Sequence, residues 1–314
     1  MLRYLAGRVG QALLVLMATF TAAFLLLQAL PGDAIMIKFM SPEMGLSADQ
    51  IAEIRASYGA DRPMWEWYFH TLYNFLTGNF GFSIQAGVPV SQQLATNLPP
   101  TLQLASLGFI AALVLTVVLA AASNMVGFGW LRAALQALPS LFISVPVFWL
   151  GIMLIQIFSF QLGLVSVISP GPIERLILPV ATLALPISAP LAQILMRNID
   201  EVLAQPFVAV ARAKGASRNW VLWKHVARNA VLPTLTIAGV LFGELLAGAV
   251  VTEAVYGLNG LGGLTNQAVG NHDTAVLQAI VVISALAFVS INLVVDLLYP
   301  VLDPRLARGV GTSS

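Results

Sequence analysis

The sequence contains very few charged residues. Charged side chains occupy 9% of its 314 positions and hydrophobic ones 58%, whereas a soluble domain carries about a quarter charged residues. So little polar surface cannot cover a water-soluble globule. Repeated apolar runs of about 20 residues, without the alternation of a β-barrel, predict an all-α polytopic membrane protein.

Cysteine is absent, which excludes structural disulfides and thiolate metal ligands. The sequence also lacks the motifs G-x-x-x-x-G-K-[ST], H-E-x-x-H and G-x-S-x-G, which argues against a nucleotide site, a zinc protease and a serine hydrolase. We therefore expect no catalytic residue and no cofactor in this chain. Its net charge of +1 argues against a nucleic-acid partner.

Six apolar runs have about the length that a bilayer requires. They cover residues 9–30, 101–123, 134–160, 176–196, 234–256 and 274–299. The third and fourth contain prolines, and broken helices persist in a membrane only where neighbours or a cavity satisfy the freed backbone groups. We expect six transmembrane helices, with the proline-containing ones lining a cavity.

The positions of Lys and Arg predict the orientation, because basic residues favour cytoplasmic loops. With the N-terminus inside, eleven basic residues lie inside and four outside, so both chain ends are predicted to be cytoplasmic. The predicted organisation is an N-terminal transmembrane helix (1–30), an extracytoplasmic loop with short helices (31–100) and a five-helix transmembrane core (101–314). The longest cytoplasmic loop spans about 198–232. In this topology His225 is inside while His70 and His272 are outside, so the three histidines are not expected to form a metal site.

Two short helices are predicted in the outer loop. Ser47 and Gln50 have the spacing of a capping box. Residues 64–76, "MWEWYFHTLYNFL", place aromatic side chains at helical spacing, as in a helix that lies at the membrane surface. Contact with a substrate is the alternative role for these aromatic residues. The expected membrane anchors are Trp65, Trp67, Tyr68 and Tyr73.

Basic residues gather in the loop 198–232. Five of the fifteen lie between Arg212 and Arg228, after an amphipathic stretch that begins near Phe207. Gly215 provides a stop signal, which predicts a short helix parallel to the membrane. Charge alone leaves two explanations, because such residues can also serve only membrane topology and contact with anionic lipid.

The order of residues in this loop is more informative than its charge. It reads A-R-A-K-G at 211–215, a basic-His pair at 224–225, R-N-A at 228–230 and L-P at 232–233. Further pieces are L-P-G-D at 30–33, G-N-F-G-F-S at 78–83, N-L-V-V-D-L-L-Y at 292–299 and D-P-R at 303–305. Together they resemble the permease subunits of ABC importers for dipeptides, oligopeptides and nickel.

The resemblance implies a type I ABC importer permease fold in a bacterial inner membrane. It also implies that a helix from about 206 to 220 docks in a cytoplasmic ATPase subunit and transmits its closure to the membrane. The partners implied are a second homologous permease, two ATP-binding subunits that bind ATP and Mg, an extracytoplasmic substrate-binding protein and membrane lipid. The residues assigned to the ATPase-coupling loop are Phe207, Ala211, Arg212, Ala213, Lys214, Gly215, His225, Arg228 and Asn229.

Glu244 stands within an apolar run, where an acid costs about 2.5 to 3.5 kcal/mol on insertion scales and so faces a cavity or a partner. Gly239, Gly243 and Ala247 recur every four residues, as in a stripe for close helix packing. The stripe favours a bond from Glu244 to a neighbouring helix. The alternative places Glu244 in the translocation path, where it attracts cationic or amine-bearing cargo. Glu253 is a second path candidate, although a capped outer loop explains it equally well.

Dipeptides or oligopeptides are the expected cargo, and nickel or a metal chelate is the alternative. Two other classes of membrane protein are alternatives. An ion-coupled secondary transporter usually shows internal repeats, and a membrane-embedded enzyme needs paired polar groups at one depth. The sequence shows no repeat and has only scattered single acids, so both are less favoured than an ATP-driven importer.

Overall fold

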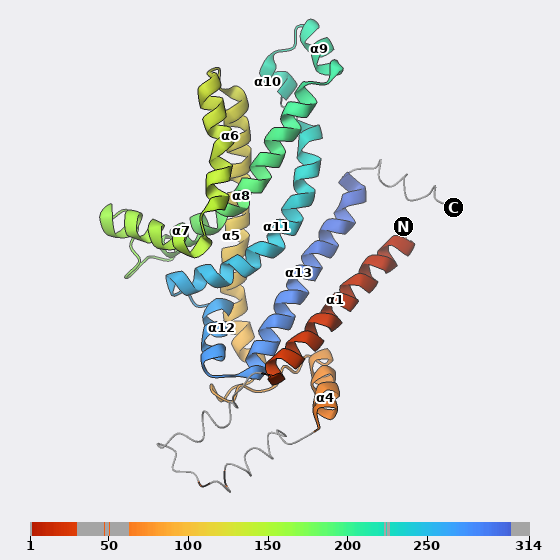
Figure 1. Cartoon of the computed structure of the whole chain (residues 1–314), viewed down its shortest axis with the longest axis vertical. Coiled ribbons are helices and arrows are strands. Elements are labelled where there is room, and N and C mark those ends of the chain that lie inside the picture. The colour runs from red at the N-terminus through yellow and green to blue at the C-terminus, as the bar shows by residue number, and fades with distance from the viewer. Residues whose placement is uncertain are drawn as a thin grey trace. The chain divides into compact units, whose positions relative to one another are not determined.

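The computed structural model describes residues 2–29, 47, 50, 63–222, 224 and 227–302. These residues are almost entirely helical (Figure 1), and their one antiparallel bridge joins Phe82 and Pro89. The predicted all-α class is therefore confirmed. The elements are α1 (Leu2–Ala29), α4 (Met64–Leu76), α5 (Val90–Met125), α6 (Gly129–Ser144), α7 (Val147–Leu154), the π-helix η1 (Ile155–Gln161), α8 (Glu174–Leu203), α9 (Pro206–Ala213), α10 (Arg218–Val221), α11 (Ala227–Tyr256), α12 (Leu261–Gly270) and α13 (Thr274–Leu302).

Five of the described helices are long and apolar enough to cross a membrane, namely α1, α5, α8, α11 and α13. The pair formed by α6 with α7 and η1 makes a sixth span if it is counted as one, although it bends by 105°. The break that the prolines predict in the run 134–160 is present. The break lies at Val145, which is extended (φ −101°, ψ 123°), because the ring of Pro146 disfavours the helical conformation in the residue before it.

The second predicted span begins earlier than expected. Its helix, α5, starts at Val90 and runs through Pro99 and Pro100, whereas the apolar run begins only at residue 101. The first turns of α5 contain polar residues and so carry no membrane signal in the sequence. The Oγ1 of Thr101 is buried and accepts a 2.8 Å hydrogen bond from the backbone N–H of Leu261, and this bond supplies one of the acceptors that the start of α12 lacks.

The chain forms two compact units. The first consists of Met1–Thr101 with Gly257–Ser290, and the second of Leu102–Tyr256 with Ile291–Ser314. The first unit has an apolar core in which α5, α12 and α13 meet, and Val90, Leu264 and Val276 are buried there. The loop before α5 is fixed to this core because Ser83 donates a hydrogen bond to Asp273, which directly precedes α13.

The predicted helix 64–76 is confirmed as α4. Tyr68 does not stand at a free surface, however, because it packs edge-on against Phe20 and Phe24 of α1, and its hydroxyl lies 2.8 Å from Oγ1 of Thr21. Its ring therefore joins α4 to α1. Trp65 and Tyr73 are exposed, as a helix at a membrane surface requires.

The predicted capping box in the outer loop is present. The backbone N–H of Ser47 donates to Oε1 of Gln50 at 2.8 Å, and the N–H of Gln50 donates to Oγ of Ser47 at 3.3 Å. These reciprocal bonds are those of a helix start. The remainder of that predicted helix lies outside the described residues.

The second unit is built around α8. Its buried residues pack with α5 and α6 in one apolar core, which also receives side chains from α9, α10 and the start of α11. Gly108 of α5 allows a close approach, since a Cβ at that position would lie 3.0 Å from Cβ of Leu183 in α8. The prolines of α8 stay inside the helix, whereas Pro146 lies between the end of α6 and the start of α7.

Candidate functional site

The basic loop contains the short helix α9. Gln205 before it is extended (φ −71°, ψ 144°), and Pro206 occupies the first helical position. Proline fits there because its ring presets φ and the first N–H groups of a helix have no intrahelical partner. Arg212 lies in the last turn, where a positive charge is favoured by the helix dipole.

Gly215 ends α9 in a left-handed conformation, with φ 87°. Its N–H donates to the carbonyl of Arg212 at 2.9 Å, and the N–H of Ala216 donates to the carbonyl of Ala211 at 3.1 Å. This pair of bonds is a Schellman motif, which glycine adopts without steric cost. The predicted stop at Gly215 is confirmed, but the predicted single helix to residue 220 is wrong, because the chain turns and begins α10 at Arg218.

The helix α9 has a buried and an exposed side. Val208 is only 1% exposed and belongs to the apolar core of α5, α6 and α8, against which Ala211 also packs. Phe207 and Val210 are 41% and 54% exposed. The apolar residues of α9 thus serve two surfaces, one that fixes the helix to its own chain and one that faces outward.

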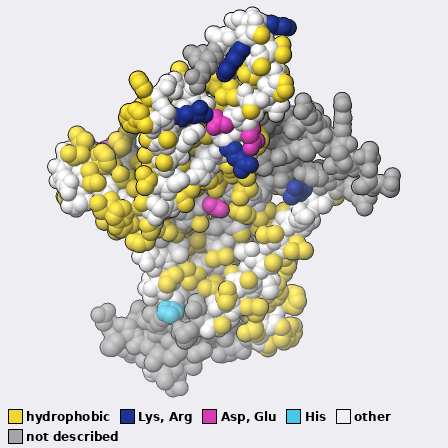
Figure 2. Space-filling view, turned by 45° about the horizontal axis from the view of Figure 1, so that its top comes forward, with side chains coloured by type: hydrophobic (Ala, Val, Ile, Leu, Met, Phe, Trp, Pro, Cys, Tyr) yellow, Lys and Arg dark blue, Asp and Glu magenta, His cyan; other side chains and the backbone are white. Residues whose placement is uncertain are grey.

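The remaining matched residues are mostly exposed. Arg212, Ala213 and Lys214 lie at the surface, and Figure 2 shows separate basic side chains over the upper half of the face in view. His225 lies outside the described residues, as do the side chains of Arg228 and Asn229 in the first turn of α11.

Sequence reasoning missed one contact in this loop. The Nζ of Lys224 stands 5.3 Å from the ring centroid of Trp220, within the range of a cation–π interaction. Trp220 is 45% exposed. The two residues are four positions apart, a spacing at which side chains on a helical turn meet, so the pattern could have been read from the sequence.

The structure separates the two acids of α11. Glu253 is 1% exposed, whereas Glu244 is exposed together with Ala247. Gly239 and Gly243 are buried, so the three small residues that the sequence groups as one stripe are divided between two sides of the helix. The open side of α11 carries Val240, Glu244, Ala247 and Val251, which recur every three or four residues.

Comparison with known proteins identifies the chain. Residues 107–308 match the family described as "Binding-protein-dependent transport system inner membrane component", and residues 1–105 match the N-terminal part of such a membrane component. The glutathione transport system permease protein GsiC of Escherichia coli (strain K12) is 34% identical over 310 residues, which cover 98% of this chain and 99% of that protein. The protein of the same name from Salmonella typhi is 34% identical over 306 residues, with the same coverage.

Two solved structures have a similar fold. The MetNI methionine ABC transporter, in inward-facing conformations, matches with a TM-score of 0.57 at 17% identity, over 67% of this chain and 96% of that one. An amino acid ABC transporter with histidines matches with a TM-score of 0.54 at 18% identity, over 67% and 94%. The predicted type I importer fold is confirmed by these matches. The chain belongs to the family of binding-protein-dependent transport system inner membrane components, and it is a multi-pass permease subunit of an ABC importer.

Proposed function

We propose that this chain forms one half of the translocation path of an ATP-driven importer of small peptides, including tripeptides of the glutathione type. The observation that carries the proposal is the outward side of α9, which presents Phe207 and Val210 beside basic residues. The peptide cargo is supported by 34% identity to glutathione permeases along nearly the whole of both chains. The chain itself performs no covalent chemistry.

The proposed complex contains a second homologous permease, two cytoplasmic ATP-binding subunits and an extracytoplasmic substrate-binding protein. ATP and Mg²⁺ bind to the partner subunits, which carry the ATPase activity. The need for a second permease is supported by α11, because a single chain leaves Glu244 on an exposed side of a membrane helix, where contact with lipid is costly.

The coupling role of α9 follows from its two sides. An ATPase subunit would receive Phe207 and Val210 as apolar anchors, with Arg212 and Lys214 at the polar rim, an arrangement common in protein interfaces. When the ATPase subunits close, α9 moves with them. Because Val208 is buried among α5, α6 and α8, and packed interiors transmit displacement rather than absorb it, the movement passes to the membrane helices as motion of rigid elements.

Glu244 is the residue that we place in the path. Its carboxylate lies on the open side of α11, where it would bind the ammonium group of a peptide by charge and hydrogen bonding. The burial of Glu253 supports a packing role for that acid instead. With both chain ends cytoplasmic, as the distribution of basic residues favours, α9 lies on the cytoplasmic side and Glu244 lies within the membrane.

Uptake into proteoliposomes tests this function. The chain is assembled with its neighbouring permease and ATPase subunits, the binding protein is added outside, and no ion gradient is applied. We expect uptake of glutathione or a dipeptide only when ATP is present in the lumen of the liposomes, which the ATPase subunits face. Uptake of a nickel chelate but of neither peptide would favour the alternative cargo, and uptake that needs an ion gradient and no ATP would favour a secondary transporter.

A further inference from the structure

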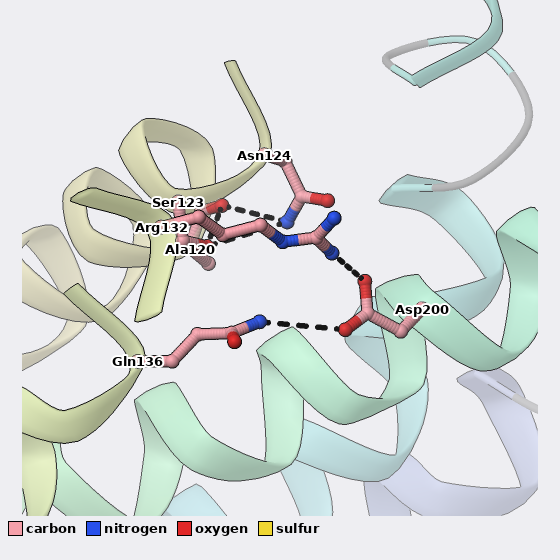
Figure 3. A network of polar contacts seen from close by, with 6 residues as sticks. All are labelled: Ala120, Ser123, Asn124, Arg132, Gln136 and Asp200. Carbon is pink, nitrogen blue, oxygen red and sulfur yellow. Dashed lines mark hydrogen bonds and ion pairs between the residues drawn. The ribbon is translucent and has the colours of Figure 1, made fainter. Parts of the chain in front are cut away.

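A single carboxylate ties the end of α8 to the start of α6. Asp200 lies in the last turn of α8, and its Oδ1 accepts a 2.6 Å hydrogen bond from Nη2 of Arg132, in the first turn of α6. Gln136 is one turn further along α6, and its Nε2 lies 3.5 Å from the Oδ2 of the same carboxylate. Figure 3 shows both side chains reaching from α6 toward Asp200. Two neighbouring turns of α6 therefore hold the two oxygens of one side chain.

These polar contacts complement the apolar packing around them. The core shared by α5, α6 and α8 holds the helices together, but apolar attraction is non-directional and does not by itself fix how far one helix is displaced along another. Hydrogen bonds depend steeply on distance and angle. The contacts of Asp200 therefore define where the end of α8 stands along α6.

The position of Asp200 relative to α9 gives the contact a mechanical role. Only six positions separate it from Pro206, and the chain between the two helices passes through Ala204 and the extended Gln205. Force applied to α9 enters α8 through this turn, beside Asp200. The side chains of Arg132 and Asp200 are 36% and 42% exposed, and exposed ion pairs contribute little to stability. Removal of the ion pair should therefore leave the fold intact.

We propose that Arg132 and Asp200 are positioning residues of the coupling mechanism. They hold the end of α8 at a fixed place along α6, so that α9 displaces the two helices together. Without the ion pair, the end of α8 moves by itself and part of the displacement is lost before it reaches the translocation path. This inference rests on the proposed coupling role of α9.

The chain offers a matched control in the adjacent residue. Glu201 forms an ion pair with Arg197 at 2.9 Å, but both belong to α8 and are exposed at the surface, with fractions of 60% and 81%. The substitutions Asp200→Asn and Glu201→Gln each remove one carboxylate charge with little change of shape. Only Asp200→Asn weakens a contact between two helices.

The experiment measures cargo taken up per ATP hydrolysed by the whole transporter in proteoliposomes, with glutathione or alanyl-alanine as the cargo. The thermal stability of the assembled complex is measured in parallel. We expect Asp200→Asn to lower the ratio about threefold or more, since residues between coupled sites alter coupling to this degree, with little change in Tm. Glu201→Gln should keep the wild-type ratio. The double variant Arg132→Asp with Asp200→Arg re-forms the ion pair with the two charges exchanged. It should restore most of the wild-type ratio.

Three results would overturn the inference: a wild-type ratio in Asp200→Asn, an equal loss in Glu201→Gln, or a double exchange that assembles with normal Tm but does not restore the ratio. Gly215→Pro, which disrupts the end of α9, is measured beside them. If Gly215→Pro also keeps the wild-type ratio, the coupling role of α9 itself fails. If Gly215→Pro lowers the ratio of cargo to ATP while Asp200→Asn keeps the wild-type ratio, only the role of Arg132 and Asp200 is rejected.

Discussion

Ser83 donates a 2.6 Å hydrogen bond to Oδ2 of Asp273, although 190 positions separate the two residues in the sequence. Both side chains are buried. The Oγ of Ser83 also accepts a bond from the N–H of Ala86, and Oδ1 of Asp273 lies 3.5 Å from the N–H of Val276 in the first turn of α13. One pair of side chains thus fixes both the loop before α5 and the start of α13.

The first prediction is that Ser83→Ala destabilises the protein. The substitution leaves a buried carboxylate without one of its donors, which costs about 1–3 kcal/mol. Thr96→Ala is the matched control, because Thr96 is exposed and its hydroxyl bonds only to the carbonyl of Gln92 in its own helix. Unfolding of the detergent-solubilised protein in a thermal ramp measures both. If the two variants lower the unfolding temperature equally, the hydrogen bond to Asp273 contributes no more to stability than the local bond of Thr96.

The second prediction is a ranking of substitutions at Gly215. No atom lies within 4 Å of a Cβ built there, so a side chain meets strain from φ 87° and no clash. Asn tolerates this conformation better than Ala, and Pro cannot adopt it and lacks the N–H that bonds to Arg212. Stimulation of ATP hydrolysis by the loaded binding protein should therefore fall in the order Gly, Asn, Ala, Pro. Full stimulation in Gly215→Pro would contradict the role of this helix end.

The elements that the sequence predicts well are those with local chemical signals. The helix 64–76, the capping box at Ser47 and the stop at Gly215 each depend on residues within one or two turns. The run 134–160 contains two prolines, and the sequence does not show which of them accompanies the bend, because Pro139 stays inside α6. Local propensity sets neither outcome alone, since tertiary packing decides whether a proline breaks a membrane helix.

The sequence does not show in the same way which side of each helix is buried and which is exposed. Phe207 and Val208 are both apolar neighbours, and only the fold shows that one is exposed and the other buried. The contact between Arg132 and Asp200 joins residues 68 positions apart, and no periodic pattern connects them. Sequence motifs therefore single out the loop, while the packing of α9 shows which of its side chains are buried and which are exposed.

The third prediction separates the two sides of α9. Phe207→Ala should weaken the association of the ATPase subunits about tenfold, as the loss of a large apolar anchor does, with little effect on the stability of the isolated chain. Val208→Ala should instead lower chain stability by about 1 kcal/mol, because it opens a cavity in the core. Pull-down of the ATPase subunits and thermal unfolding of the chain measure the two effects. Similar effects of the two variants in both assays would contradict the assignment of sides.

The fourth prediction concerns the two acids of α11. Glu244→Gln should lower the uptake of peptide cargo about tenfold while the assembled complex stays as stable as the wild type, because the substitution removes a charge from an exposed side chain that would pair with an ammonium group.

Glu253→Gln is the paired variant, since Glu253 lies on the same helix but is buried. It should change thermal stability more than cargo uptake, because a buried polar group acts mainly through its packing and hydrogen bonds. Both variants are measured for uptake rate and Tm in the same preparation. If Glu244→Gln transports normally, the acid has only a packing role against the second permease. If Glu244→Gln instead lowers Tm and leaves the uptake per assembled complex unchanged, the roles of the two acids are reversed. The path then runs along another side of α11.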